Sequence, residues 1–426
     1  MKKVVLTALF VASASSALAG DWTFNPKLYV RGGFTQSIDL DAKGDGVSPF
    51  NANGYNETNA FQNGLTELDL HAMYKDKAKI VYGINVDNNE RFQVADAAKS
   101  TDHNSLLKER QAYIEFYKAF GDNSTLWFGH RPYRGFGDYM DGTFPLDERN
   151  MFGGGIMLDD FGIGRYEVAY GTNEKGEDGS VTNDNYTTNF LLNKYIIGID
   201  NGNITLNGEI HQNNSIDKVN ESYGYMIGGQ YARWNMSLLG AKWYNIFVLN
   251  YSHGHLGSVD AGEMSSAFDS YKKNEQAQRL TFKIGGDLKS NAWSMFYTVK
   301  YQNHMGDKNN GHTKSEQNWQ FTDLMIRPMY ALTSNVGVGV DGLTRFVLKQ
   351  PGKGTTDSDW ARDTDMWRLA AVANYHLDAG GENLFQNAEV SVFAGRAHHD
   401  KETTFFKGRS SSKDADFVRV KYTMEI

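Results

Sequence analysis

The sequence predicts an all-β protein, specifically a transmembrane antiparallel β-barrel, and three observations lead to it. Side chains of one chemical kind recur at every second position in segments from both ends of the chain, which is the period of a strand. The 426 residues contain no Pro-rich or Ser-rich linker and no shift in composition that would mark a domain boundary. With 23 Tyr, 25 Phe and 44 Gly against six Pro, the composition favours uninterrupted strands.

The alternation has one apolar face and one polar or charged face. It is seen in residues 27–34 (KLYVRGGF), 66–74 (TELDLHAMY), 165–171 (RYEVAYG), 293–302 (WSMFYTVKYQ) and 418–426 (VRVKYTMEI). In the last of these, Val418 and Val420 oppose Arg419 and Lys421. Between such segments lie stretches rich in Gly, Asn and Asp, which are typical of turns and loops.

Alternation alone does not separate a water-soluble sandwich from a membrane barrel, because the two bury opposite faces of the same pattern. Three features favour the barrel. The chain is long without a domain boundary. Many apolar faces end in Tyr or Trp, like the rings of aromatic residues that barrels place at the two membrane–water interfaces. An alternating segment also runs to the final residue, as closure of a barrel requires. An exported soluble β protein is the alternative.

The first residues predict a signal peptide. Lys2 and Lys3 precede the apolar run Val4–Val11, and small residues follow up to Ala17-Leu18-Ala19, which resembles a cleavage site. We therefore expect a signal peptide over residues 1–19 and the barrel over residues 20–426. The alternative is a buried N-terminal helix.

Charge and cysteine content exclude several classes of function. The formal net charge is −8 and the isoelectric point is near 5.8, so no electrostatic footprint for nucleic acid is expected. Without cysteine, disulfides and thiol chemistry are impossible. The mean hydropathy of −0.53 is compatible with a barrel, in which lipid-facing and lumen-facing residues average out.

Short motifs offer no catalytic residues, metal ligands or cofactor site. Residues 337–342 (GVGVDG) match a dinucleotide fingerprint but lie inside an alternating strand pattern. Residues 39–46 (DLDAKGDG) begin like a calcium loop, yet Phe50 stands where the bidentate Glu belongs. His398 and His399 could bind a metal ion together only if both side chains pointed the same way. Because adjacent residues on a strand point to opposite faces, we expect these two histidines to lie in a loop rather than to bind a metal.

Residues 124–158, STLWFGHRPYRGFGDYMDGTFPLDERNMFGGGIML, resemble the strand and inward-folded loop of the maltoporin family of outer-membrane sugar porins. Residues 318–330 (NWQFTDLMIRPMY) and 383–402 (NLFQNAEVSVFAGRAHHDKE) resemble further family segments. Together with the first strands, these pieces follow the family order over most of the chain.

The resemblance implies a homotrimer of barrels with about 18 strands each, each narrowed by an inward-folded constriction loop. Such a protein lies in the outer membrane of a Gram-negative bacterium, among lipid and lipopolysaccharide. It is a channel for facilitated diffusion of maltodextrin-type sugars, with no enzymatic activity and no cofactor. Sugar rings pack on a row of aromatic side chains, while their hydroxyls bond to charged groups.

The family positions carry over residue by residue. The aromatic slide falls on Tyr29, Tyr244 and Phe385. Charged lumen positions fall on Arg31, Glu67 and Lys108, and the constriction group falls on Arg134, Asp138, Tyr139, Asp141 and Phe144. Gly153–Gly155 would let the chain turn back into the wall.

Two departures bear on the solute. Leu65 stands where the slide has an aromatic residue, and the family's terminal tryptophans have no counterpart after Ile426. Two rival functions remain open: a general or differently selective porin on the same barrel, and a structural or adhesive barrel whose loops bind a partner.

Overall fold

The computed structural model describes residues 21–37, 65–87, 107–133, 149–175, 186–215, 222–254, 256, 277–307, 317–349, 365–377, 386–403 and 412–425. These residues form one 18-stranded sheet. Its strands are β1 (Trp22–Ser37), β2 (Leu65–Tyr74), β3 (Ala78–Asp87), β4 (Leu107–Tyr117), β5 (Ser124–Tyr133), β6 (Arg149–Phe161), β7 (Gly164–Lys175), β8 (Tyr186–Ile199), β9 (Gly202–Ser215), β10 (Ser222–Leu238), β11 (Ala241–Gly254), β12 (Gln278–Lys289), β13 (Trp293–Asp307), β14 (Gln317–Ala331), β15 (Val336–Lys349), β16 (Met366–His376), β17 (Gln386–Thr403) and β18 (Ser412–Glu425).

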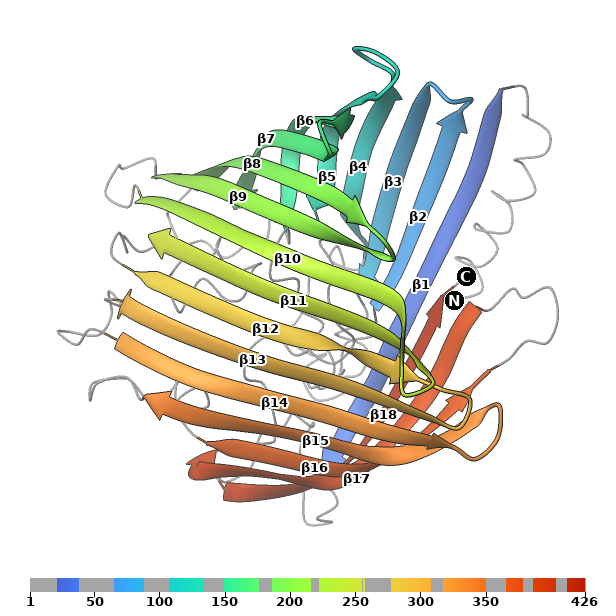
Figure 1. The fold of residues 1–426 in the computed structure, drawn as a ribbon, viewed down its shortest axis with the longest axis vertical. Helices are drawn as coiled ribbons and strands as arrows, with labels where there is room; N and C mark the ends of the chain where they lie inside the picture. Colours follow the sequence, from blue (N-terminus) through green and yellow to red (C-terminus); the bar gives the residue numbers. More distant parts are fainter. Residues whose placement is uncertain are drawn as a thin grey trace, which may run out of the picture.

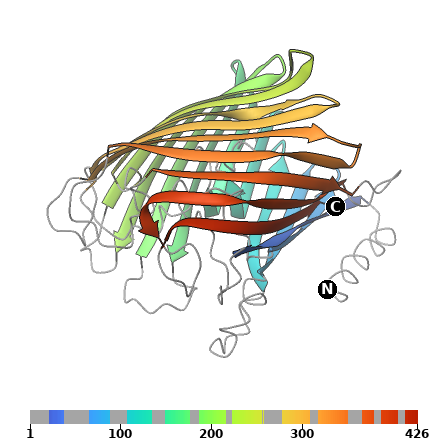
Figure 2. The ribbon, with the colours of Figure 1, turned by 90° about the horizontal axis from the view of Figure 1, so that it is seen from below.

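The sheet is antiparallel throughout and closes on itself. Each strand pairs with the next in sequence, and β1 also pairs with β18, with Tyr29 opposite Glu425 and Ser37 opposite Phe417. Figures 1 and 2 show the two ends of the colour range, blue β1 and red β18, side by side. The predicted closed antiparallel barrel is confirmed, and closure leaves no free sheet edge of the kind that membranes do not tolerate.

Connections alternate between short turns and longer segments. Short turns join β2 to β3, β6 to β7, β8 to β9, β10 to β11 and β12 to β13, whereas residues 38–64 and 88–106 separate β1 from β2 and β3 from β4. In the β10–β11 hairpin, Leu239 and Gly240 both have positive φ, at 52° and 76°. Two central residues with positive φ match the right-handed twist of the flanking strands. This alternation of turn lengths is typical of outer-membrane barrels.

Burial follows the alternation, but with the chemistry reversed relative to a water-soluble protein. On β9, Leu206 and Ile210 are half exposed, at 51% and 54%. Their immediate neighbours on the strand, Thr205 and Glu209, are buried. On β11, Leu249 is exposed and Asn250 is buried. A closed barrel encloses only its inner side chains, so the buried polar set faces the interior and the apolar set faces outward. These two sets are called the inner and outer faces below.

Aromatic side chains gather on the outer face beside the short turns. Trp22 packs on Tyr74 with ring centroids 5.1 Å apart. The indole Nε1 of Trp243 donates a hydrogen bond of 2.7 Å to the hydroxyl of Tyr297, which in turn donates one of 2.7 Å to Asn245. Rings with an apolar body and a polar tip suit the boundary between lipid and water.

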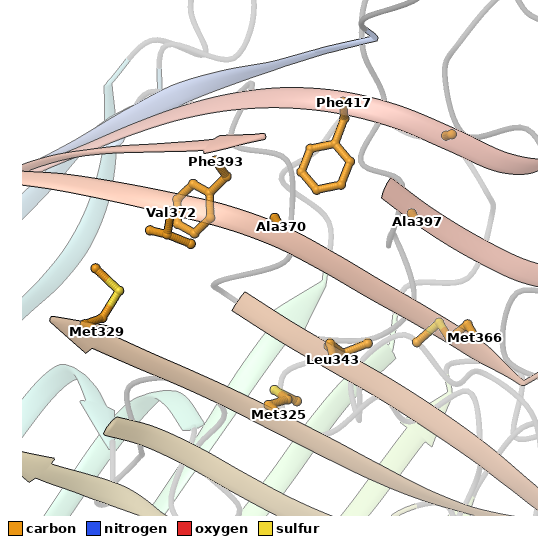
Figure 3. Close-up of a cluster of buried hydrophobic side chains, with 10 residues drawn as sticks. Met325, Met329, Leu343, Met366, Ala370, Val372, Phe393, Ala397 and Phe417 are labelled. Atoms are coloured by element: carbon orange, nitrogen blue, oxygen red, sulfur yellow. The ribbon is translucent and has the colours of Figure 1, made fainter. Parts of the chain in front are cut away.

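Apolar residues also occupy part of the inner face. The largest cluster spans β14 to β18 and consists of Met325, Met329, Leu343, Met366, Ala370, Val372, Phe393, Ala397, Ala415 and Phe417. Figure 3 shows these side chains contributed by adjacent strands. A second inner cluster, on β5 to β8, includes Trp127, Met157 and Phe190.

Gly153–Gly155 lie within β6, so the expectation that they form a return of the chain into the wall is wrong. A Cβ on Gly155 would lie 2.5 Å from the indole Nε1 of Trp127 and 2.7 Å from the carbonyl oxygen of Val168. Trp127 is fully buried on the neighbouring strand. The glycine is therefore required because a large indole and a backbone carbonyl approach it closely, not because the chain turns.

No helix among the described residues is both long and apolar enough to cross a membrane.

Candidate pore interior

The inner face of β12 to β15 carries a row of charged side chains across four adjacent strands. Lys283 on β12 lies directly opposite Lys300 on β13, which lies opposite Asp323 on β14, which lies opposite Arg345 on β15. All four are almost completely buried, with at most 1% of each exposed. The alternation places each of them inward, and the antiparallel register then brings them level with one another.

Asp323 is the acid of this row. Its Oδ1 accepts a hydrogen bond of 2.6 Å from Arg345 Nε, and its Oδ2 accepts one of 2.8 Å from Arg345 Nη2. The ammonium of Lys300 lies 3.8 Å from Oδ2. The planar guanidinium fork matches both carboxylate oxygens, which gives the pair a fixed geometry as well as charge.

Asp341 holds two arginines in a second group. Arg327 Nε donates to its Oδ1 at 2.9 Å, and Arg368 Nη2 donates to its Oδ2. The three residues come from β14, β15 and β16 and are all buried. Two cations share one acid, so this group carries a formal surplus of positive charge.

Arginines of the same wall stack on phenylalanine rings. The guanidinium carbon of Arg345 lies 4.1 Å from the ring centroid of Phe321. Those of Arg327 and Arg419 lie 5.1 and 5.2 Å from the centroid of Phe393. A guanidinium over a ring face is attracted by the electrons of the ring, so these contacts help to hold the arginines at the wall.

The opposite part of the barrel, β2 to β5, has more evenly matched charges. Arg110 contacts the carboxylates of Glu67, at 3.5 Å, and of Asp69. Glu115 accepts from Arg131 at 3.0 Å and lies 3.7 Å from Lys79. One group has two acids on one base and the other has two bases on one acid, so the formal charges of the two groups together cancel.

Two of the predicted slide residues lie on the inner face. Tyr29 pairs directly with Glu67, so the two side chains share one face of the sheet. Tyr244 pairs directly with Asp287 and is in phase with buried Asn250. Phe385 lies outside the described residues.

The structure describes some of the predicted charged positions fully, some by their backbone only and others not at all. Glu67 is on the inner face with Arg110, as described above. Arg31 lies in β1, where its backbone pairs with Leu65 and Thr423, and Lys108 lies in β4, where its backbone pairs with Asn85. The constriction group, Arg134, Asp138, Tyr139, Asp141 and Phe144, lies outside the described residues.

Sequence reasoning did not single out the charged groups of β14 to β16. The signal was present, because Asp323 and Arg327 occupy alternate positions in residues 318–330, the segment that resembles the porin family. Their partners Arg345, Asp341 and Arg368 follow only from the register between strands, which one sequence does not provide.

His398 and His399 lie within β17, so the expectation of loop histidines is wrong; the strand runs on to Thr403. His398 Nδ1 lies 3.0 Å from Asp414 Oδ1, and this pair is at the outer, exposed side. Within the ranges that the structure describes, no group of three His, Asp or Glu side chains could hold a metal ion.

Comparison with solved structures places the fold among bacterial porins. OccAB1 of Acinetobacter baumannii is 10% identical, with 95% of this chain and 96% of that chain covered and a TM-score of 0.52. A BenF-like porin from Pseudomonas fluorescens Pf-5 is 9% identical, with 95% and 99% covered and a TM-score of 0.50. At such low identity this likeness concerns the fold alone.

Comparison with families is more specific. The family model described as LamB porin matches residues 25–417, from the first strand to the last. The match agrees with the polar inner face, the apolar outer face and the closed ring of strands. This chain therefore belongs to the LamB porin family, and it is a channel of the outer membrane through which solutes diffuse.

Proposed function

We propose that this chain mediates facilitated diffusion of sugars, among them maltodextrin-type oligosaccharides, into the periplasm. The observation that carries the proposal is the register between Tyr29 and Glu67 on the inner face, with Glu67 in turn paired to Arg110. An aromatic ring beside a charged pair offers an apolar surface to a sugar ring and strong partners to its hydroxyls.

In this mechanism the sugar moves between several weak sites. Tyr29, Tyr244 and Phe385 form the aromatic slide, and Arg31, Glu67 and Lys108 supply charge beside it. The loop residues Arg134, Asp138, Tyr139, Asp141 and Phe144 narrow the passage. Conduction requires binding that is favourable enough for entry yet weak enough for release, so no single contact is expected to dominate.

Planar-bilayer conductance in the presence of maltotriose tests the proposal. We expect maltotriose to block the ion current in a concentration-dependent manner, and Tyr29→Ala to weaken this block by about tenfold, as loss of one stacking face would. Phe24→Ala is the matched control, because Phe24 lies on the outer face of the same strand and is 37% exposed. Current that maltotriose leaves unblocked in the unaltered channel would overturn the proposal.

A differently selective porin on the same barrel is the second candidate, favoured by the charged inner face of β12 to β18, where cations outnumber acids among the described buried side chains. Such a pore selects by charge rather than by stacking. Liposome swelling with maltooligosaccharides against size-matched polyols distinguishes the two, since only the sugar channel admits maltooligosaccharides faster. A structural or adhesive barrel would give no single-channel current steps at all.

The proposed assembly is a homotrimer in outer-membrane lipid and lipopolysaccharide. Its test is the mass of the detergent-solubilised protein, measured by light scattering with the detergent contribution subtracted. A mass of one chain would contradict the trimer and leave the channel function unaffected.

A further inference from the structure

A row of inward side chains crosses three neighbouring strands close to the short turns. Tyr244 on β11 lies directly opposite Asp287 on β12, which lies directly opposite Phe296 on β13. Asp287 is in phase with buried Lys283, so the row belongs to the inner face. Figure 1 shows the three strands side by side. An acid therefore stands between two aromatic residues on the inner wall of the barrel.

The acid of this row has a basic partner that is open to solvent. Asp287 forms an ion pair with Lys289, the last residue of β12. The Lys289 side chain is 57% exposed and that of Asp287 is 15% exposed. For comparison, the side chains of Glu67 and Arg110 are each 13% exposed. The charges beside Tyr244 are therefore at least as accessible as the pair already proposed to bind a sugar.

Phe296 gives Lys289 a second contact. The Lys289 ammonium lies over the Phe296 ring, 5.3 Å from its centroid. The ring itself packs against the inner apolar cluster defined above, which supports it from behind. Because an aromatic face attracts an ammonium, the ring helps to hold Lys289 beside Asp287 although more than half of the lysine is exposed.

Folding stability gives only a weak reason for this ion pair. A pair whose lysine is more than half exposed contributes little, because water screens its charges. The pairing also leaves both groups able to bind a solute. A carboxylate accepts several hydrogen bonds and an ammonium donates more than one, so each can bond to a hydroxyl group while the ion pair persists.

The row at Tyr244 lies far around the ring from the charged partners proposed above. Those partners, Arg31, Glu67 and Lys108, belong to β1, β2 and β4. In the closed ring, β12 is 12 − 2 = 10 strands from β2 in one direction and 18 − 10 = 8 in the other. A sugar ring packed on Tyr244 therefore needs polar partners of its own, and the ion pair on β12 is in register to supply them.

We propose that Tyr244, Asp287 and Lys289 form a further sugar-binding site, called the turn-side subsite below. The sugar ring packs on Tyr244, and its hydroxyls bond to the carboxylate and the ammonium. Phe296 is a positioning residue that holds Lys289. The two charges are equal and opposite, which suits a neutral sugar. The inference rests on the proposed function in taking sugars as the solutes, and it adds three residues to which that function gives no role.

Current block by maltotriose in purified full-length Tyr29→Ala channels tests the turn-side subsite, because this variant weakens the group on β1 and β2. We expect a residual block that depends on the maltotriose concentration. Asp287→Asn in this background should raise the half-blocking concentration by about fivefold, because asparagine keeps the shape but replaces charge-assisted hydrogen bonds by weaker neutral ones. Lys289→Gln should act in the same direction, whereas Lys289→Arg keeps the charge and should retain the block.

A double-variant comparison tests the role of Phe296. Phe296→Leu should weaken the residual block while Lys289 is present, and it should have no further effect in Lys289→Gln channels. A residue that only supported the wall by packing would weaken the block to the same extent in both cases. That result would overturn the positioning role.

Asp76→Asn is the matched control. Asp76 also pairs with a lysine near the short turns, at 3.0 Å from Lys118, but it lies in the β2–β3 turn rather than on the inner face of a strand. Its replacement should leave the residual block unchanged. The urea midpoint of the Asp287→Asn channel should match that of its Tyr29→Ala parent. A lower midpoint together with a lost block would assign Asp287 to folding and overturn the subsite.

The outcomes separate the turn-side subsite from the proposed function. If maltotriose blocks the unaltered channel but not the Tyr29→Ala channel, the subsite is overturned and the sugar channel stands. The same conclusion follows if Asp287→Asn leaves the residual block unchanged. If maltotriose leaves the unaltered channel unblocked, the proposed function falls and the subsite falls with it.

Discussion

Arg345 on β15 and Asp323 on β14 form a bidentate ion pair. Both donor–acceptor distances are below 3 Å, and neither side chain is exposed. Desolvation of two buried charges is costly, and their attraction offsets it only when geometry is good and both partners are present. The pair therefore holds the two strands in register as long as both partners are present. Removal of either one leaves a buried charge without its main counter-charge.

Replacement of Arg345 by Met should destabilise the barrel by about 3–5 kcal/mol, because the buried Asp323 carboxylate loses its principal counter-charge. Urea unfolding in lipid vesicles measures this cost. The double variant Arg345→Met, Asp323→Leu should cost less than the single, since no carboxylate is left uncompensated. A double variant whose cost equals the sum of both singles would show that the residues are not coupled.

Gly155→Ala should destabilise the barrel by about 1–3 kcal/mol through overpacking. The added methyl group meets both the Trp127 indole and the Val168 carbonyl oxygen. In a Trp127→Leu background the penalty should fall only in part, because the carbonyl remains. Gly208→Ala is the matched control, since a Cβ there meets nothing within 4 Å. Equal cost at Gly155 and Gly208 would contradict the close contact with Trp127.

Leu206→Lys should destabilise the inserted barrel by about 2–4 kcal/mol if the residue lies near the bilayer midplane, because it places a charge in lipid. Gln230→Lys on the neighbouring strand β10 adds the same charge to the inner face. We expect it to cost less and to shift the reversal potential instead. The opposite ranking in vesicle unfolding would show that the two faces are assigned the wrong way round.

Leu239→Asn should stabilise the β10–β11 hairpin by about 1 kcal/mol, because leucine is strained at positive φ and asparagine tolerates it. The leucine is 89% exposed, so little packing is lost. Leu239→Ala separates the two effects, since alanine removes the side chain but keeps the strain. The urea midpoint of each variant measures the difference, and an unchanged midpoint for Leu239→Asn would contradict the strain.

Alternation was sufficient to predict which residues share a face, because the strand period is two and does not depend on the neighbouring strand. It placed Glu67 with Asp69 and Lys300 with Gln302 on polar faces, as the structure has them. The reversed burial, with polar side chains enclosed, required the further step that the sheet closes into a barrel.

Local sequence failed where an interaction between strands decided the outcome. Gly153–Gly155 resembled a turn, but glycine is required at position 155 because the Trp127 indole on the neighbouring strand leaves no room for a Cβ. Arg345 and Asp323 are 22 residues apart, and the alternation within each strand does not set the register between the two strands. Both cases depend on long-range pairing, which periodicity does not encode.

The pairing of β1 with β18 has a consequence for how the chain reaches the membrane. Among the described strands, every other neighbouring pair is consecutive in sequence. The nine register positions between Tyr29–Ser37 and Glu425–Phe417 therefore form only after the whole polypeptide has been synthesised and exported. Until then two strand edges stay open, each able to pair with another chain and aggregate. Closure of the ring and protection of its two open edges thus depend on the same nine pairings.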